Sequence, residues 1–453
     1  MKNKKFARYA PFLLVAAVGL FYHLRMQPMG GDDVFFSQAT EGTTLWAYLL
    51  HRYLNWTSRA VSELVLVNVI QIPLLWRAID FLMFATLPLL FVGILLWEHS
   101  DANFRSVVAK DPLVNWCAAA AVLLFPFHDM GTAGWITTTV THFWPLWGIF
   151  FLGVLVKKML VGARIHPVEG IFGALVCIVT GSHEQYAVIQ CVVLLLYGFY
   201  LWKEKKKPSN LPVLAALSAV NVISLAIILF CPGNAARNAV SIADLPIYAE
   251  FGFAEKLYLG LLSIERVFIG NADAVFFTVA LLWTGLVCVK TRDYKKTLLS
   301  GLPFLILFGQ TVVRTAYPGL AGLFVMPGEV LEWSWSELST WLPMVYLAVT
   351  VAAMIYALYQ LFGENLREYF YLLILLGMGF GAGMVLGFAA TIYVSGERVY
   401  APLYAILLFV TLLGIYRQRD TVQEKHNEMG AKLLGTLSAA MCVVNVIFVA
   451  LSV

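Results

Sequence analysis

Two adjacent carboxylates, Asp32 and Asp33, follow two glycines directly after the first apolar stretch of the chain. A carboxylate at a membrane edge can take a proton from a hydroxyl nucleophile or bind a divalent cation. The alternative is a solvated Gly-Gly-Asp-Asp turn that caps a helix starting at Val34, a role that suits Asp33. The pair is therefore a candidate catalytic centre, with either Asp32 or Asp33 as the acting residue.

Three arginines stand beside aromatic or turn-forming residues and are candidates for binding phosphate, because an arginine fork can hold a phosphate through two parallel hydrogen bonds. Each has an ordinary alternative. Trp and Arg often anchor a chain at the membrane interface, Pro-Gly-Asn is a turn sequence, and an adjacent Glu and Arg can neutralise each other. The residues concerned are Trp56, Arg59, Asn234, Arg237, Glu397 and Arg398.

Polar residues also open two of the apolar stretches. Histidines and threonines there can hydrogen-bond sugar hydroxyls or line a wet cavity, although threonines also pack membrane helices together. Glu184 lies in a turn with almost no loop, at or just above hydrocarbon depth, where a carboxylate is costly unless it is paired; capping is the alternative. The candidate substrate-binding residues in these stretches are His128, Asp129, Trp135, Thr138, His142, His183 and Glu184.

The composition indicates the kind of protein that must position these residues. The chain has 453 residues, of which 60% are hydrophobic and 13% charged, and its mean hydropathy is +0.78. Soluble domains carry about 25% charged residues, so we expect an all-α, polytopic membrane protein with a single membrane domain over residues 1–453. The six cysteines lack paired spacing and suggest neither disulfides nor a metal site.

Runs of about 20 apolar residues are long enough to cross a bilayer as helices. Thirteen ranges approach this criterion, with several of them short. They are 9–27, 75–97, 113–127, 136–156, 168–181, 186–202, 211–231, 273–290, 298–314, 339–362, 370–392, 399–416 and 433–452. The first reads as an uncleaved helix because no small-residue cleavage site follows it.

The distribution of Lys and Arg predicts a cytoplasmic N-terminus. With that orientation the cytoplasmic segments hold 22 of the 31 basic residues and the outer side holds 8. This distribution of basic residues requires that residues 59–74 do not cross the membrane. We therefore expect the first outer loop, 28–74, to carry amphipathic helices at the membrane surface. The outer loops 232–272 and 315–338 are also long, and we expect a helix to begin at Phe253 in the first of them. With this orientation the aspartate pair, the three arginine clusters and the two polar stretches described above all fall on the outer side.

This pattern resembles the C-type (GT-C-like) polytopic integral-membrane glycosyltransferases, in particular a bacterial branch. The resemblance rests on the acidic pair in the first outer loop and on three short motifs: Trp-x-x-Arg at 56–59, Pro-Gly-Asn-x-x-Arg at 232–237 and Ser-Gly-Glu-Arg at 395–398. It implies transfer of a sugar from a polyprenyl-phosphate carrier to an acceptor on the outer face, with inversion and with the first-loop Asp as base. The chain differs in lacking a large C-terminal soluble domain, which leaves the acceptor open.

On this hypothesis Arg59, Arg237 and Arg398 stabilise the leaving phosphate, while Trp135, Thr138, His142 and Glu184 contact the sugar. A divalent cation is possible but not required. The expected partners are a lipid-linked sugar donor and a cell-envelope glycan or lipid acceptor in the bacterial plasma membrane, with no nucleic acid. Three alternatives are a polysaccharide polymerase or ligase, a transporter or flippase of lipid-linked sugars, and a membrane scaffold.

Overall fold

A computed structural model describes residues 2–207, 209–244, 246–271, 273–323, 334–392, 395–424 and 429–453. The protein is 83% helical, and the described residues contain no strand. They form two compact units, of which the first holds residues 1–123, 127–240 and 448–453 and the second holds 124–126 and 241–447. The fold class expected from the composition is thus confirmed as all-α.

The first unit begins with three long helices separated by short ones. Helix α1 packs against α5, and α5 packs against α9. The elements from the start of the chain to the first π-helical turn, η2, are α1 (Lys2–Arg25), α2 (Asp32–Ser37), α3 (Leu45–Asn55), α4 (Ala60–Val69), α5 (Pro73–Leu96), α6 (Phe104–Lys110), α7 (Pro112–Leu124), η1 (Phe127–Gly131), α8 (Trp135–Thr138) and η2 (Thr139–Phe143).

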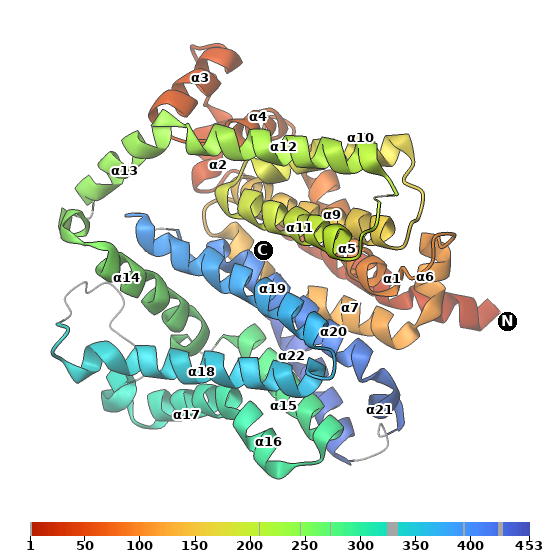
Figure 1. Ribbon diagram of the computed structural model, residues 1–453. Helices are drawn as coiled ribbons and strands as arrows, with labels where there is room; N and C mark the ends of the chain where they lie inside the picture. Colours follow the sequence, from red (N-terminus) through yellow and green to blue (C-terminus); the bar gives the residue numbers. More distant parts are fainter. Residues whose placement is uncertain are drawn as a thin grey trace. The chain divides into compact units, whose positions relative to one another are not determined.

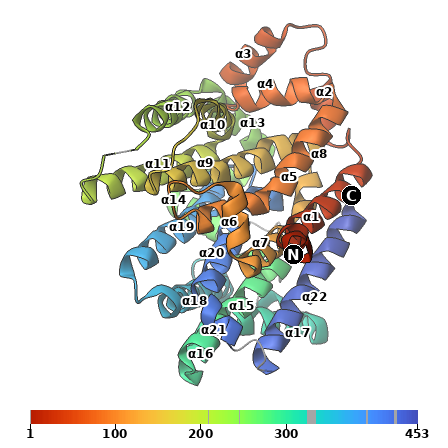
Figure 2. The same cartoon turned by 90° about the vertical axis from the view of Figure 1, so that its right-hand side faces the viewer.

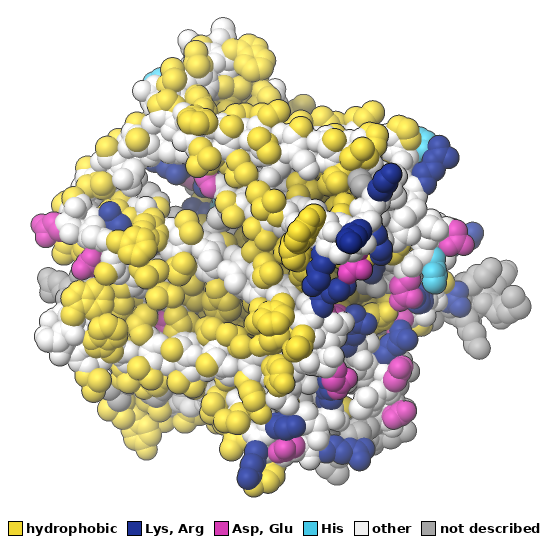
Figure 3. Space-filling model, in the orientation of Figure 1, with side chains coloured by type: hydrophobic (Ala, Val, Ile, Leu, Met, Phe, Trp, Pro, Cys, Tyr) yellow, Lys and Arg dark blue, Asp and Glu magenta, His cyan; other side chains and the backbone are white. Residues whose placement is uncertain are grey.

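Four helices, α9 (Trp144–Leu160), α10 (Pro167–Gly181), α11 (Glu184–Lys203) and α12 (Leu211–Leu229), lie side by side in the first unit (Figures 1 and 2). Their shared core contains Leu155, Cys177, Leu194 and Leu217. The outward side of α12 is apolar, with Val222 65% and Leu229 78% exposed (Figure 3), as expected of a helix facing lipid. Helix α13 (Pro232–Asp244) follows it.

The second unit packs α15 against α18 and α20, and α19 against α14 and α20. Its elements are η3 (Pro246–Glu250), α14 (Phe253–Glu265), η4 (Arg266–Gly270), α15 (Ala274–Thr291), α16 (Tyr294–Ser300), α17 (Leu302–Ala316), η5 (Pro318–Leu323), α18 (Leu338–Phe362), α19 (Leu366–Met384), η6 (Val385–Phe388), η7 (Glu397–Tyr400), α20 (Ala401–Arg417), α21 (Arg419–Glu424) and α22 (Met429–Ser452). A helix does begin at Phe253, as expected.

Nine helices in the described part of the chain are long and apolar enough to cross a membrane, or eleven if two bent pairs each count as one span. These helices indicate a membrane protein. A helix occupies each of the thirteen ranges predicted from the sequence. Helix α1 is not among the candidate spans found in the described residues, and α10 has only 15 residues, so the count of thirteen crossings stays a prediction.

The segment 28–74, predicted as the first outer loop, contains α2, α3 and α4 between residues 32 and 69. Helix α4 has only 10 residues, fewer than a crossing requires. In the loop predicted at 315–338, residues 324–333 lie outside the described residues. Candidate site residues lie on helices in two of the predicted loops, with Asp32 and Asp33 on α2 and Asn234 and Arg237 on α13.

Candidate functional site

Asp33 is completely buried and uses both carboxylate oxygens as hydrogen-bond acceptors. Its Oδ1 accepts from the backbone N–H of Thr137 at 2.8 Å and from the Thr137 hydroxyl at 2.7 Å. Its Oδ2 accepts from the N–H groups of Met29 at 3.2 Å and Ile136 at 3.3 Å. Asp33 therefore caps α8, about 100 residues further along the chain. The alternative interpretation, in which Asp33 caps a helix that starts at Val34, does not hold, because that helix starts at Asp32 with Gly31 as N-cap.

Two glycines allow this close approach. Gly134 has φ +102°, and a Cβ there would lie 2.6 Å from Asp33 Oδ1. Gly31 has φ +55°, and a Cβ there would lie 2.9 Å from the carbonyl carbon of Ala133. Only glycine accepts both the left-handed backbone and the missing space. The beginning of α2 is thus held against the start of α8.

Asp32 has a different environment from its neighbour. Its backbone N–H donates to the carbonyl of Ala133 at 2.9 Å, which fixes the main chain. Its side chain is exposed, and within the described residues it has no hydrogen bond or ion pair. Of the two aspartates, only Asp32 keeps its carboxylate oxygens available.

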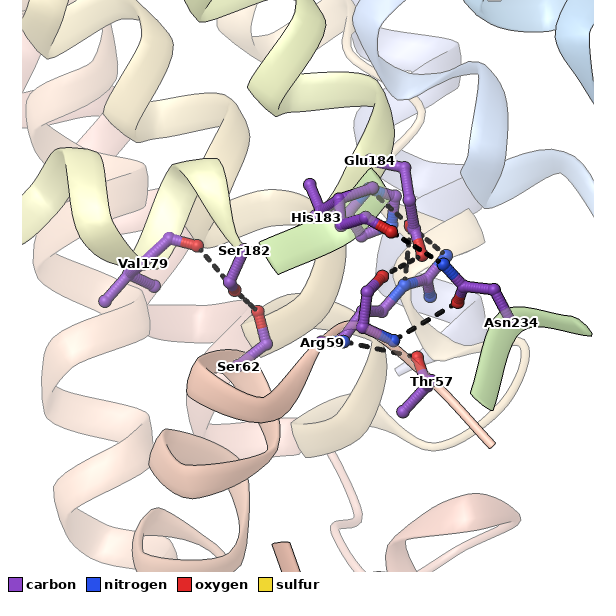
Figure 4. A network of polar contacts seen from close by, with 10 residues as sticks. Thr57, Arg59, Ser62, Val179, Ser182, His183, Glu184 and Asn234 are labelled. Carbon is purple, nitrogen blue, oxygen red and sulfur yellow. Dashed lines mark hydrogen bonds and ion pairs between the residues drawn. The ribbon is translucent and has the colours of Figure 1, made fainter. Parts of the chain in front are cut away.

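A second group of candidates meets at the beginnings of α4, α11 and α13 (Figure 4). Glu184 accepts from Arg59 Nε at 2.9 Å and lies 2.8 Å from the Nη2 atom of the same guanidinium. Its other oxygen accepts from the Ser58 hydroxyl at 2.9 Å. The Ser58 N–H donates to Asn234 Oδ1 at 3.2 Å. Three predicted clusters, at least 50 residues apart in sequence, therefore form one network.

The start of α13 is docked onto the end of α3. The Cys231 thiol donates to the carbonyl oxygen of Tyr53 at 3.1 Å. A Cβ on Gly233 would lie 2.5 Å from the backbone nitrogen of Trp56, so glycine is required for this contact. This docking carries Asn234 to the network and brings Arg237, one turn later on the same helix, toward it.

Arg237 is half-buried, and its guanidinium has no hydrogen bond or ion pair among the described residues. Burial lowers the pKa of Arg237, and the positive charge of Arg59 lowers it further. The negative charge of Glu184 acts in the opposite direction. The guanidinium groups of Arg59 and Arg237 thus both interact with the carboxylate of Glu184. Only Arg59 forms an ion pair with it, and Arg237 has no ion-pair partner among the described residues.

His183 is buried beside this network, with 1% of its surface exposed and no hydrogen bond to either ring nitrogen. Its Nδ1 lies 3.8 Å from Glu184 Oε2. Burial, followed by the charges of Arg59 and Arg237, holds the pKa of His183 well below its usual range, so the ring is neutral at pH 7.

The ring of His183 lies 4.9 Å from that of His142, tilted by 63°. His142 belongs to η2, a π-helical turn, and such turns frequently occur at functional sites. Because η2 directly continues α8, one short element connects the anchor of Asp33 with His142.

Other candidates have structural contacts instead. The Trp56 ring lies 5.5 Å from the guanidinium of Arg52, which forms an ion pair with Glu63. Trp135 is buried and stacks against Phe127. Thr138 is buried, and its hydroxyl has no hydrogen-bond partner in the described residues.

His128 and Asp129 form a pair of their own, with His128 Nε2 3.2 Å from Asp129 Oδ1. The His128 ring packs against Phe448 at 4.6 Å. Burial lowers the pKa of His128 to about 4, so it is neutral at pH 7. Within the described residues no contact joins this pair to Arg59 or Glu184.

Glu397 and Arg398 belong to the second unit, in η7. Glu397 accepts from the Asn271 side-chain amide at 2.9 Å. Nearby, Asp273 caps α15 and accepts from the Tyr404 hydroxyl at 3.0 Å.

The sequence analysis missed a buried pair between α1 and α5. His23 Nε2 lies 2.8 Å from Asp80 Oδ2, and the other oxygen of Asp80 accepts from Trp144 Nε1 at 2.7 Å. His23 Nδ1 lies 2.6 Å from the carbonyl of Gly19 and must donate to it, because a carbonyl only accepts. Asp80 is the one acidic residue in the predicted range 75–97, and that acid was the available signal.

No group of three or more His, Cys, Asp or Glu residues in the described ranges is placed to hold a metal ion. The carboxylates of Asp33 and Glu184 are already occupied by N–H, hydroxyl and guanidinium donors. The arrangement around Arg59 and Arg237 is suited to an anion instead.

Comparison with protein-family models, with curated proteins and with solved structures finds no match for this chain.

Proposed function

We propose that this protein is a multi-pass membrane glycosyltransferase that moves a sugar from a polyprenyl-phosphate carrier to an acceptor on the outer face of the membrane. One observation carries the proposal. The half-buried guanidinium of Arg237 has no partner among the described residues and lies in the field of Arg59, where three segments distant in sequence meet.

The arginine pair supports binding of a phosphate group. Two neighbouring guanidinium groups repel each other, and Glu184 compensates only one of them. An arriving phosphate relieves the remaining repulsion and accepts hydrogen bonds from Arg237. The N-terminus of α11, a 20-residue helix, adds a partial positive charge at Glu184. In the reaction these groups stabilise the negative charge that develops on the leaving phosphate.

The acid–base role fits Asp32 better than Asp33. Asp33 accepts four hydrogen bonds and is buried, so it positions the loop. Asp32 is exposed and takes the proton of the acceptor hydroxyl as that oxygen attacks the anomeric carbon of the sugar. The bond from this carbon to the phosphate oxygen breaks, and the lipid phosphate leaves with the electron pair. Asp32 takes up one proton, and the configuration at the anomeric carbon of the sugar is inverted.

The lipid chain of the donor has a candidate location in the first unit. A groove of about 510 Å³ between α11 and α12 is lined by Cys191, Leu195, Phe199, Trp202 and Val222, among others. Helix α11 carries Glu184 at its first position, and Cys191 lies seven residues later, about 10 Å along the helix. A hydrocarbon chain in this groove extends from the phosphate site toward the other end of α11.

The proposed topology is thirteen crossings in the bacterial plasma membrane, with a cytoplasmic N-terminus and α2–α4 at the outer surface. Helix α3 supports the last point, because Trp46, Leu50 and Leu54 form one exposed stripe at a spacing of four residues. Reporter fusions near Lys205 and near Asn234 test this topology. They are expected on opposite sides of the membrane, and the same side for both contradicts it.

Asp32→Asn and Asp33→Asn, each purified and assayed for sugar transfer, test the chemistry. Asp32→Asn is expected to lose at least a hundredfold in kcat with unchanged donor binding. Asp33→Asn is expected to lower thermal stability as well as activity, because the cap on α8 weakens. Full activity in Asp32→Asn overturns the assignment of the base.

Transport of a lipid-linked sugar is the second candidate, favoured by the buried polar side of α11. The hydroxyls of Tyr186 and Tyr197 and both polar atoms of Gln190 are buried and have no hydrogen-bond partner among the described residues. Polar groups inside a membrane helix often mark a transport path. Translocation of labelled donor across vesicles without cleavage of the sugar supports transport, whereas cleavage supports the transferase.

A further inference from the structure

We propose that Glu184 determines specificity: it leaves the phosphate site with a single uncompensated positive charge and so selects a headgroup with one negative charge over one with two. The inference rests on the proposed function and deepens it, because the charge of the headgroup separates a monophosphate-linked donor from a diphosphate-linked one.

The charged groups around the site add up to this single uncompensated positive charge. Arg59 and Arg237 carry one positive charge each, and Glu184 carries one negative charge. Arg52 also acts on Arg237, but it is paired with Glu63, whose oxygens accept from its Nε and Nη2 at 2.6 to 3.1 Å. One charge, that of Arg237, has no counter-ion among the described residues.

His183 adds no charge to this count. Its pKa lies well below its usual range because the ring is buried beside Arg59 and Arg237. Asn234 and Ser58 are neutral, and each already uses a polar group inside the network. The site therefore offers an incoming anion one uncompensated guanidinium, that of Arg237, beside the Arg59 guanidinium that is already paired with Glu184.

The position of Glu184 allows it to act on a ligand directly. Its side chain is 28% exposed, and that of Arg59 is 27% exposed, so the ion pair faces an accessible surface. Both carboxylate oxygens are engaged, Oε2 with Arg59 and Oε1 with Ser58. A phosphate bound to Arg237 and Arg59 lies beside this fixed negative charge. A second phosphate in the same headgroup meets the repulsion of Glu184 without a further cation to offset it.

Binding of two probes that share the isoprenyl chain and differ in the charge of the headgroup tests the inference. The methyl ester of a C15 isoprenyl phosphate carries one negative charge, and the methyl ester of the corresponding diphosphate carries two. The wild-type protein in detergent is expected to bind the first more tightly. Glu184→Gln keeps an acceptor for Ser58 but removes the charge, and it is expected to change the ratio of the two Kd values at least tenfold in favour of the diphosphate, about 1.4 kcal/mol.

Two further variants separate charge from structure. Glu184→Asp keeps the charge and is expected to retain the wild-type preference. Glu169→Gln is a matched control, because Glu169 is also a quarter-exposed glutamate in an ion pair, with Lys158 at 2.5 Å. It lies at the other end of α10, about 18 Å from the start of α11. A ratio that changes equally in Glu169→Gln and Glu184→Gln, or that does not change in Glu184→Gln, overturns the inference.

Dimethyl phosphate and dimethyl diphosphate, which lack the lipid chain, distinguish the source of the headgroup. Weaker binding of both than of the isoprenyl probes supports a lipid donor. Equal binding of the chain-free compounds contradicts the lipid donor of the proposed function. The charge preference is still measured with this pair, so the two failures are distinguishable.

Discussion

The buried carboxyl group of Glu265 in the second unit allows a quantitative prediction of how stability depends on pH. It ends α14, directly before the π-helical turn η4, and it is completely buried. Neither carboxylate oxygen has a hydrogen-bond partner among the described residues. Burial raises the pKa of Glu265 from 4.5 to about 8, so the carboxyl group is protonated at pH 7. Glu265→Gln replaces this neutral acid by a neutral amide of the same shape.

The expected effect of Glu265→Gln depends on pH. In the unfolded chain Glu265 ionises near pH 4.5, whereas in the folded protein it stays protonated up to about pH 8. The wild-type protein is therefore most stable, with respect to this group, below pH 4.5, and it loses stability as the pH rises toward 8. The loss is about 1 kcal/mol at pH 5 and about 4 to 5 kcal/mol at pH 8.5. The glutamine variant does not titrate and avoids this loss.

Thermal unfolding in detergent at pH 5 and at pH 8.5 measures the difference. Glu265→Gln is expected to exceed the wild type in Tm at pH 8.5, with a much smaller difference at pH 5. The matched control is Glu255→Gln on the same helix, a half-buried carboxylate, for which no pH-dependent gain is expected. A Tm difference for Glu265→Gln that is the same at both pH values refutes the reasoning.

Two predictions concern the first unit. Asp80→Ala leaves His23 and Trp144 without their shared acceptor. We expect it to lower the free energy of unfolding by about 3 to 5 kcal/mol. A change as small as that of the exposed control Asp101→Ala contradicts this structure. Asp33→Asn turns one acceptor oxygen into a donor that faces N–H groups, and we expect a loss of about 1 to 3 kcal/mol. Asp32→Asn, next to it and exposed, should unfold like the wild type, and equal losses in both variants argue against the cap on α8.

The positions of the long helices could be predicted from the sequence because an apolar run of membrane length has few alternatives to a helix. A helix occupies the predicted range 75–97, for example, as α5 over Pro73–Leu96. The number of crossings could not be fixed in the same way. Helix α10 has 15 residues, and its apolar run alone does not say whether it spans.

The candidate residues of the first unit were found in the sequence, but their grouping was not. Arg59, Glu184 and Asn234 were assigned to three separate clusters, and the helix starts that bring them together pack through contacts between distant segments. Such contacts leave no local pattern.

The partner of Asp33 could not be predicted, because local spacing offered only a cap on the following helix as the alternative to a catalytic role. The true partner, α8, becomes accessible only through the close approach at Gly134. Asp80 was overlooked for a different reason. The range 75–97 was assigned from its apolar residues alone, although one acid in such a range is itself a signal.

The central claim is that the arginine pair binds the phosphate of a lipid-linked sugar donor during transfer. The most direct measurement uses a radiolabelled polyprenyl-phosphoryl sugar with purified protein and a cell-envelope extract as acceptor, and follows the label by chromatography. The account predicts that label moves from the carrier to the acceptor, with at least a hundredfold lower rate in Arg237→Gln and an unchanged rate in the exposed control Arg25→Gln. Transfer at the full rate by Arg237→Gln, or no release of sugar from the carrier by the wild-type protein, contradicts it.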